Sequence, residues 1–326
     1  MLYSQASSAS TLHIPDGFLS VLVSLVFWIV SAIIIAVALR RVQGEIGERE
    51  LPLMGVMAAA IFAGQMINFS IVGGTSGHLL GAALATILLG PWSAILIMTA
   101  VVSVQALVFQ DGGILTLGAN LFNMGVIGVS VAYASYTASA RLLRRASWGL
   151  NAAGFVSGWF SIFIAALSCG LQLAWSGVSP ARIVLPAMAG IHALIGLGEG
   201  LITAGALVFL SAARPALRDR ARAGNRTNRG VFSAGILFSL LLIVLSPLAS
   251  TQPDGLFWVA GQSGFLDKAR SAVYQIFPNY SLPGFTNPAL ARVFAGTLGL
   301  VIVTAVTYGL ARRGRRDVVK KPREVE

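Results

Sequence analysis

Three histidines are the residues best suited to metal chemistry in this sequence: His13, His78 and His192. Histidine is a frequent ligand of borderline transition metals, although a single histidine more often has a structural, hydrogen-bonding role. His13 and His78 each lie beside a glycine-containing turn at the end of an apolar segment, and together they favour a metal site. Pro15 keeps the chain near His13 extended, and Asp16-Gly17 is expected to form a turn or an N-cap for the next helix. His192 lies deeper in an apolar run, where we expect it to support the ligands or the packing rather than to coordinate the ion.

The residue before His13 decides how strongly this histidine could bind an ion. In a mature chain that began at Leu12, the free α-amine of residue 12, the amide nitrogen of His13 and its imidazole Nδ1 would chelate one ion in fused rings. His78 would add a fourth nitrogen and complete a square plane. Such a site suits Ni²⁺, Cu²⁺ and, less well, Co²⁺, whereas Zn²⁺ prefers a tetrahedron and Mg²⁺ and Ca²⁺ prefer oxygen ligands.

Residues 1–11 conflict with this chemistry, because they turn the nitrogen of Leu12 into an ordinary amide. Bacterial translation can start at UUG or CUG codons, which encode leucine inside a gene. We therefore expect the working protein to start at Leu12, with residues 1–11 either not translated or removed. The alternative is a genuine N-terminal extension with a weaker site.

Several other polar residues lie near these histidines or inside apolar segments. Thr75, Ser76, Asn120 and Asn123 could orient metal ligands or only satisfy backbone groups of helices, and the sequence leaves both roles open. Glu199 lies within an apolar segment, where an unpaired carboxylate is costly. A structural role and coupling to other subunits are both open for this residue.

The composition is typical of a polytopic membrane protein. Of the 326 residues, 56% are hydrophobic and only 11% are charged, so long uncharged runs must exist. The net charge of +11 might suggest nucleic acid, but Lys and Arg fall in short clusters between apolar runs and at the C-terminus. That distribution indicates membrane topology, and we expect no nucleic-acid partner. The single cysteine, Cys169, excludes an intramolecular disulfide and is expected to be a small buried hydrophobe.

The apolar segments predict an all-α fold, a polytopic membrane helix bundle, because most of them approach the roughly 20 residues that a spanning helix needs. One short, glycine-bordered segment is expected to line a cavity instead of facing lipid. Basic clusters follow the odd-numbered segments, which places the N-terminus outside by the positive-inside rule. His13, His78 and Asp111 would then share the outer side of the membrane. The segments are 18–39, 53–72, 77–89 (the short one), 92–109, 114–137, 150–174, 184–211, 231–247 and 291–311.

A basic linker at residues 213–230 is expected to divide the chain. The first seven segments, within residues 12–212, are predicted to form one compact, metal-binding bundle. The last two, within residues 231–311, are predicted to form a separate two-helix hairpin that encloses a long outer loop, 248–290. Residues 312–326 are predicted to be a basic cytoplasmic tail.

Several motifs along the first seven segments resemble one transporter family. They are His13-Ile-Pro-Asp-Gly-Phe-Leu, Gly74-Thr-Ser-Gly-His-Leu-Leu-Gly81, Gln110-Asp-Gly-Gly113, Gly118-Ala-Asn-Leu-Phe-Asn-Met-Gly125 and His192-Ala-Leu-Ile-Gly-Leu-Gly-Glu-Gly200. Together they resemble the CbiM/NikM family, the substrate-binding membrane components of energy-coupling factor (ECF) transporters for cobalt and nickel. The last hairpin, with Pro253-Asp254-Gly255-Leu256 in its loop, resembles the small auxiliary CbiN/NikN subunit fused to the C-terminus.

The resemblance implies both a site and partners. It implies a seven-helix S-component-like core that holds Ni²⁺ or Co²⁺, as transported substrate, through the amine of position 12, His13 and His78. It also implies an ECF transmembrane coupling subunit and ATPase subunits on the cytoplasmic side of a bacterial inner membrane, and a C-terminal loop that helps to load the metal. The sequence contains no Walker A pattern, so ATP hydrolysis is expected in the partners and not in this chain.

Two other functions use some of the same residues. An intramembrane serine protease would use Ser76, within Gly74-Thr75-Ser76-Gly77, as nucleophile and His192 as its base. This hypothesis gives His13 no function. A stand-alone secondary nickel permease would carry several ionisable residues along one helix, such as an H-x4-D-H signature, which the sequence lacks. Metal capture is the interpretation that uses most of the motifs.

Overall fold

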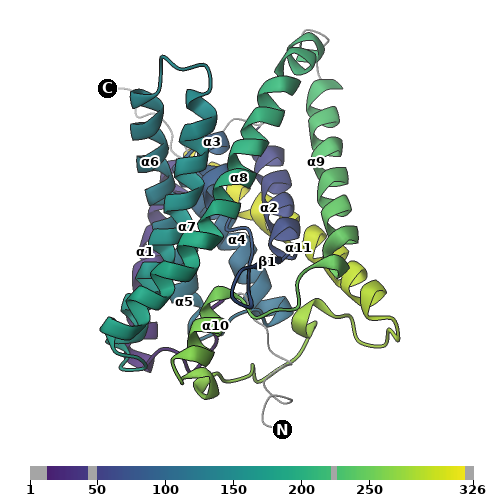
Figure 1. Cartoon of the computed structure of the whole chain (residues 1–326). Coiled ribbons are helices and arrows are strands. Elements are labelled where there is room, and N and C mark those ends of the chain that lie inside the picture. The colour runs from purple at the N-terminus through teal and green to yellow at the C-terminus, as the bar shows by residue number, and fades with distance from the viewer. Residues whose placement is uncertain (1–12, 43–49, 222–225, 320–326) are drawn as a thin grey trace, which may run out of the picture.

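The computed structural model describes residues 13–42, 50–221 and 226–319, and most of these residues are helical (Figure 1). The long helices follow the predicted apolar segments. Asn287 and Pro288 show how local sequence sets the start of one of them, the helix that begins at Pro288. The Asn287 side chain accepts a hydrogen bond from the backbone N–H of Ala289, and proline is favoured at a first helical position. The helices are α1 (Val21–Val42), α2 (Glu50–Gln65), α3 (Ala82–Leu89), α4 (Pro91–Phe109), α5 (Leu117–Asn120), the π-helix η2 (Leu121–Ile127), α6 (Gly128–Leu142), α7 (Gly149–Trp175), α8 (Ala181–Ala221), α9 (Arg226–Leu245), α10 (Gly255–Gln262) and α11 (Pro288–Val319), with 3₁₀ turns η3 (Ser246–Leu248), η4 (Leu266–Lys268) and η5 (Pro278–Tyr280).

Six helical stretches among the described residues are long and apolar enough to cross a membrane. The first of them, α1, exposes large apolar side chains such as Leu22 and Ile29, which suits contact with lipid and not with water. The chain is therefore a multi-pass membrane protein with an all-α bundle, and the predicted fold class is confirmed. The six stretches are Val21–Val42, Pro91–Phe109, Leu117–Leu142, Gly149–Trp175, Ala181–Leu210 and Pro288–Arg313.

The predicted segment 53–72 was wrong at its C-terminal end, and the segment 77–89 was wrong at its N-terminal end. Helix α2 ends at Gln65, and the chain then forms a small antiparallel hairpin of β1 (Phe69–Ile71) and β2 (Thr75–Gly77). Gly73 and Gly74, in the connecting turn, have positive φ angles that interrupt a helix. Gly81 also has a positive φ, so α3 begins only at Ala82 and is too short to span a membrane.

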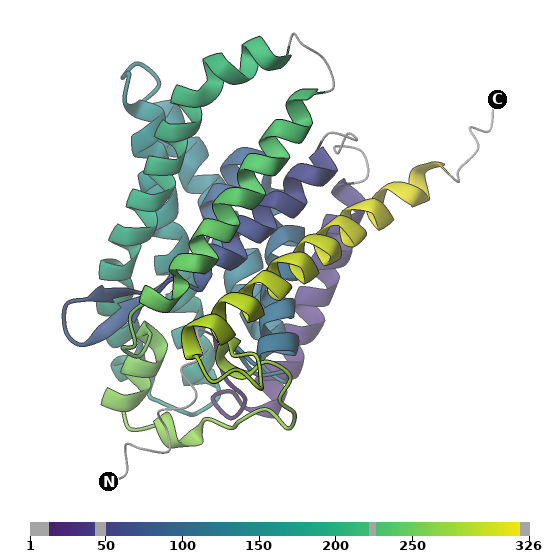
Figure 2. The same ribbon diagram turned by 90° about the vertical axis from the view of Figure 1, so that its right-hand side faces the viewer.

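The two C-terminal helices pack on the core helix α2, as Figure 2 shows for α9 and α11. Gly235 of α9 lies against Val56, and Gly299 of α11 lies against Phe62, so small residues let the helices approach closely. Helix α8 continues to Ala221 and α9 begins at Arg226, so much of the predicted linker 213–230 is helical. The division of the chain into functional units stays a prediction.

One end of the bundle carries the β-hairpin, α10 and the loop 248–290, and the described chain also begins there (Figure 1). The basic residues that end α1 and α6, Arg40, Arg41 and Arg141, lie at the opposite end. This polarity agrees with the positive-inside pattern, and it places the first two histidines together at the end that carries the loop.

Candidate metal site

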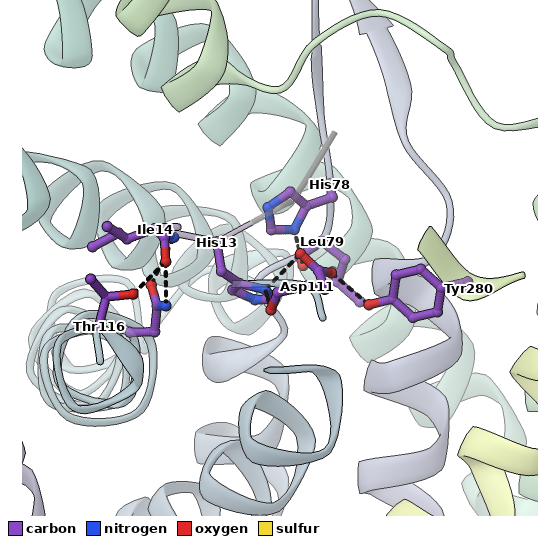
Figure 3. A network of polar contacts seen from close by, with 8 residues as sticks. His13, Ile14, His78, Leu79, Asp111, Thr116 and Tyr280 are labelled. Atoms are coloured by element: carbon purple, nitrogen blue, oxygen red, sulfur yellow. Dashed lines mark hydrogen bonds and ion pairs between the residues drawn. The ribbon is translucent and has the colours of Figure 1, made fainter. Parts of the chain in front are cut away.

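The segment after His13 is held by hydrogen bonds from the stretch 113–120. The Asn120 side chain accepts from the backbone N–H of Ile14 at 3.0 Å and donates to its carbonyl at 3.1 Å. The Thr116 hydroxyl donates to the same carbonyl at 2.7 Å (Figure 3). Asn120 therefore pairs with both backbone groups of Ile14, and it fixes the position of the neighbouring His13.

Asp16 lies in the turn that was predicted here, and its carboxylate binds a distant segment. Its carboxylate accepts from the backbone N–H groups of Ile114 and Thr116, at 3.2 and 3.1 Å, and so stabilises the approach to α5 instead of capping the helix that follows Asp16. Gly113 leaves the room for this contact, because a Cβ at that position would collide with the Asp16 carboxylate. Of the turn or N-cap predicted at Asp16-Gly17, the turn is confirmed, because the Phe18 N–H donates to the Pro15 carbonyl at 3.4 Å, whereas the side chain of Asp16 binds a distant segment and forms no N-cap.

His13 is buried against Asp111. Its Nδ1 lies 3.1 Å from the Asp111 carbonyl oxygen and 3.1 Å from the carboxylate oxygen Oδ1. Burial lowers the pKa of His13, but the Asp111 charge and hydrogen bonds outweigh burial and raise the pKa above its ordinary value. The Tyr280 hydroxyl donates to the other carboxylate oxygen, Oδ2, at 2.6 Å (Figure 3). The first predicted ligand is thus in contact with a carboxylate.

His78 follows strand β2 and faces His13. Its Nδ1–H donates to the Leu79 carbonyl at 2.9 Å, so Nε2 is the nitrogen of the neutral ring that can coordinate a metal. The centres of the two rings are 6.1 Å apart, with planes inclined by 61°. Metal–nitrogen bonds of about 2.0–2.1 Å place the centres of two adjacent imidazoles on one ion roughly 4.5 Å apart. The fold brings the two predicted histidine ligands near each other, and the rings would have to approach further to share an ion.

Glu199 of α8 holds the loop that carries His78. Its two carboxylate oxygens accept from the backbone N–H groups of Leu80 and Gly81, at 2.7 and 2.9 Å. The Gln65 side chain donates to the Leu80 carbonyl at 2.9 Å from the other side. Of the two roles left open for Glu199, the structure shows the structural one, because the carboxylate fixes the chain just after His78.

Replacing Glu199 with alanine is expected to displace the His78 loop and to weaken metal binding. The change leaves two buried N–H groups without acceptors, which costs about 1–3 kcal/mol each in the free energy of unfolding. Glu199→Gln keeps one acceptor and should lie between wild type and alanine. Thermal unfolding in detergent and nickel titration measure both effects. Thr203→Ala is the matched control: it is one turn along α8, fully buried, and its hydroxyl has no hydrogen-bond partner among the described residues. An equal loss in both alanine variants would contradict a specific role for Glu199.

A cavity of about 80 Å³ adjoins His13 and His78 and is lined by the third histidine, His192. The Nδ1–H of His192 donates to the Met188 carbonyl at 2.9 Å. The sequence reasoning missed Asp254 in this lining and did not anticipate that Cys169 would take part in it. Imidazole, thiol and carboxylate groups therefore line the same small cavity as the predicted ligand pair.

Thr75 and Ser76 attach the loop 248–290 to the site. The Ser76 backbone N–H donates to the Pro253 carbonyl at 2.8 Å, and its hydroxyl donates to the Gln252 carbonyl at 2.9 Å. The Thr75 hydroxyl donates to the Pro253 carbonyl at 3.1 Å. Both residues therefore satisfy backbone groups of the loop.

Asp254 follows this attachment point and forms the N-cap of α10, because its side chain accepts from the Phe257 N–H at 2.9 Å. Burial raises the pKa of Asp254 to about 7, against the opposing effect of this hydrogen bond. The Pro-Asp-Gly-Leu motif of the loop thus closes one side of the cavity. The sequence identified this motif only as part of the outer loop, and its contact with β2 was not predicted.

Asn123 lies in the π-helix η2 and pairs with the Gln172 side chain, with 2.8 and 2.7 Å between their amide groups. The Ser168 hydroxyl donates to the same Asn123 oxygen at 2.7 Å. Asn120 holds Ile14, as described above, so the two asparagines have different tasks. π-Helical turns inside α-helices occur frequently at functional sites, and this one presents Asn123 and Met124 to the cavity.

Leu12, the third predicted ligand residue, lies outside the described residues. Within residues 13–42, 50–221 and 226–319, no three side chains of His, Cys, Asp and Glu are grouped as a metal site would require. The predicted site differs from such a group, because it uses two histidine side chains together with nitrogens of the backbone and the terminus. It also needs Nδ1 of His13, which now contacts Asp111, so the ring would have to rotate about Cβ–Cγ to coordinate an ion.

The helical bundle, with a partly polar cavity at one end, defines a multi-pass membrane protein, and the comparisons with known proteins give its class. Two family models match the chain: "Cobalt uptake substrate-specific transmembrane region" over residues 13–217 and "PDGLE domain" over residues 229–316. The chain belongs to the CbiM family, with a fused NikN-like part.

Relatives and solved structures agree with this assignment. The chain is 37% identical to the putative fused nickel transport protein NikMN of Archaeoglobus fulgidus over 93% of its length and 99% of the relative's. It is 32% identical to the fused nickel transport protein NikMN of Rhodobacter capsulatus, with 84% of each chain covered. A crystal structure of a truncated transition metal transporter matches with a TM-score of 0.55 and 32% identity, over 61% of this chain and 98% of the other.

The chain is thus a transport component and not an enzyme. The serine protease alternative also gains no support from the geometry, since the Ser76 hydroxyl donates to the backbone carbonyls of Gln252 and Pro253. Ser76 attaches the outer loop to the core.

Proposed function

We propose that this protein captures Ni²⁺ or Co²⁺ as the substrate-binding component of an ECF-type transporter. The observation that carries this proposal is the pair His13 and His78, with ring centres 6.1 Å apart, at the end of the bundle opposite the basic helix ends. Both rings line the same buried cavity. The ion is the transported substrate, held until the protein reorients and releases it on the other side.

The proposed ligands are the α-amine of Leu12, the amide nitrogen and Nδ1 of His13, and Nε2 of His78. The hydrogen bonds of Asn120 and Thr116 to Ile14 support this set of ligands, because they fix the backbone directly after the chelating residues. Ligand binding requires the neutral imidazole and releases protons, so Nδ1 of His13 must lose the proton that it now directs at Asp111. His192 remains a supporting residue in this proposal.

Nickel is the ion that we favour. Three relatives that align with 73–93% of this chain are named fused nickel transport proteins, from Archaeoglobus fulgidus, Rhodobacter capsulatus and Lactiplantibacillus plantarum. A relative from Sorangium cellulosum named a cobalt transport protein aligns with 64% of it. A square of four nitrogens also suits Ni²⁺ better than Co²⁺.

The proposed partners are an ECF transmembrane coupling subunit and ATPase subunits in a bacterial inner membrane. The sequence lacks a Walker A pattern, so the energy for transport would come from those subunits. The N-terminus and the histidine pair would face outward, because the basic helix ends lie at the opposite end of the bundle.

Metal analysis of the chain, purified in detergent without chelators, tests the proposal. We expect nickel or cobalt to be retained in a fixed ratio to protein and Ni²⁺ to displace Co²⁺ in competition, with no retention of Mg²⁺ or Ca²⁺. Co-expression with the coupling and ATPase subunits should give uptake of radioactive nickel that an inactive ATPase abolishes. A chain that binds neither ion, or uptake without the ATPase, would contradict the proposal.

A further inference from the structure

Tyr280, in the outer loop 248–290, is hydrogen-bonded to the carboxylate that contacts His13. Its hydroxyl donates to Oδ2 of Asp111 at 2.6 Å, while Oδ1 of the same carboxylate lies 3.1 Å from His13 Nδ1. Figure 3 shows the three side chains in this order, and all three are buried. A residue of the C-terminal part of the chain is therefore connected to a proposed metal ligand through a single carboxylate.

The local structure of the loop directs Tyr280 to this contact. Asn279 and Tyr280 both have positive φ angles, 52° and 57°, a conformation that non-glycine residues seldom adopt. Such backbone persists only where the surroundings hold it. The Tyr280 ring stacks on Phe109, with centres 4.8 Å apart and planes 15° from parallel. Packing and hydrogen bonding together thus keep the phenol against Asp111.

The carboxylate that Tyr280 holds has a clear chemical use. Histidines that bind metals almost always donate their other ring N–H to a carboxylate or carbonyl, which fixes the ring orientation and raises its basicity. When Nδ1 of His13 turns to the ion, the proton of the neutral ring moves to Nε2. Asp111 is the carboxylate already in contact with this ring. In the metal-bound arrangement of the proposed site, it would accept from Nε2 instead of Nδ1.

We propose that Tyr280 is a positioning residue for metal capture, which fixes the Asp111 carboxylate against His13 and so couples docking of the outer loop to the orientation of the metal-binding imidazole. This inference rests on the proposed function. It differs from simple attachment of the loop, for which the structure offers another tyrosine. The Tyr274 hydroxyl donates to the Leu107 carbonyl at 2.8 Å, so it ties the same loop to the same end of α4 without touching Asp111.

Nickel titration of the full chain in detergent compares Tyr280→Phe with Tyr274→Phe. Phenylalanine keeps the stacking on Phe109 and removes only the hydroxyl. We expect Tyr280→Phe to weaken nickel binding by about 10-fold or more, the usual range for partners of metal ligands, and Tyr274→Phe to change it by less than about 3-fold. The visible spectrum of bound Ni²⁺ should stay the same in both variants, because the ligands are unchanged.

A double-mutant cycle tests whether Tyr280 acts through Asp111. Asp111→Asn should weaken binding by about 10–100-fold, and adding Tyr280→Phe to it should cause little further loss. Circular dichroism and elution volume confirm that each variant is folded, and Asp111→Asn tests the same hydrogen bond if Tyr280→Phe is unstable.

Several results would overturn the inference alone: wild-type affinity in Tyr280→Phe, equal losses in both tyrosine variants, or full additivity with Asp111→Asn. A wild-type chain that binds neither Ni²⁺ nor Co²⁺ would instead overturn the proposed function and this inference with it.

Discussion

His78→Ala is expected to weaken nickel binding by more than about 100-fold, since partners that only orient metal ligands are already worth about 10–100-fold. The Nδ1–H of His78 is committed to the Leu79 carbonyl, so Nε2 is the coordinating nitrogen and no other atom of the ring can replace it. Isothermal titration with Ni²⁺ and metal analysis after gel filtration would measure the loss. The fold should persist, because the adjacent chain is held separately by Glu199 and Gln65.

His192→Ala is the matched control for this prediction. His192 lines the same cavity and also directs its Nδ1–H to a backbone carbonyl, that of Met188. In the proposed site it supports the ligands without coordinating, so we expect a loss of at most about 10-fold. Equal losses in both variants would move His192 into the ligand set. Unchanged binding in His78→Ala would mean that the ion does not bind between His13 and His78.

The features predictable from the sequence were those set by local composition and periodicity. Apolar runs identified the long helices, and the basic clusters at their ends gave a polarity that puts His13 and His78 at the same end of the bundle. The histidine pair followed from this polarity together with the flanking turns. These predictions succeeded because a membrane-spanning helix is specified by its own residues, with little help from distant ones.

The features that could not be predicted depend on contacts between distant segments. The three residues Phe69–Ile71 give little sign that β1 pairs with β2, and the attachment of Pro253 to Ser76 joins residues 177 positions apart in the sequence. Asp16 has a typical N-cap sequence, yet its carboxylate binds Thr116. Propensity and pattern do not report such pairings, because the polar partners are supplied by the tertiary fold.

The two largest parts of the site therefore come from different ends of the chain. The core supplies His13, His78 and Asn120, whose side chain is hydrogen-bonded to the Ile14 backbone. The loop 248–290 supplies Asp254 and Tyr280. Because both parts lie on one chain, the effective concentration of the loop at the site is high, which favours its docking.

The chemical state of the residue before His13 is expected to have an effect as large as that of His78. We compare the chain of residues 1–326 with a chain of residues 12–326 in which an initiator methionine replaces Leu12. The shorter chain has a free α-amine at position 12, whereas the longer chain has an amide there, which does not donate a lone pair to an ion without losing its proton. Nickel affinity should be more than about 100-fold higher in the shorter chain, a difference of roughly 2.7 kcal/mol or more.

A chain with one alanine added before position 12 isolates the amine from other effects of residues 1–11. The added residue moves the amine out of the chelate ring but leaves His13, Asn120 and the rest of the site unchanged, so its affinity should match that of the long chain. The short chain alone should show the spectrum of planar, four-nitrogen Ni²⁺. Intact-mass measurement of the protein from its native source then reports which N-terminus is present in cells. If a long chain with residues 1–11 intact binds as tightly as the short one, the amine is not a ligand, and His13 binds through its side chain in the orientation that Asp111 and Tyr280 allow.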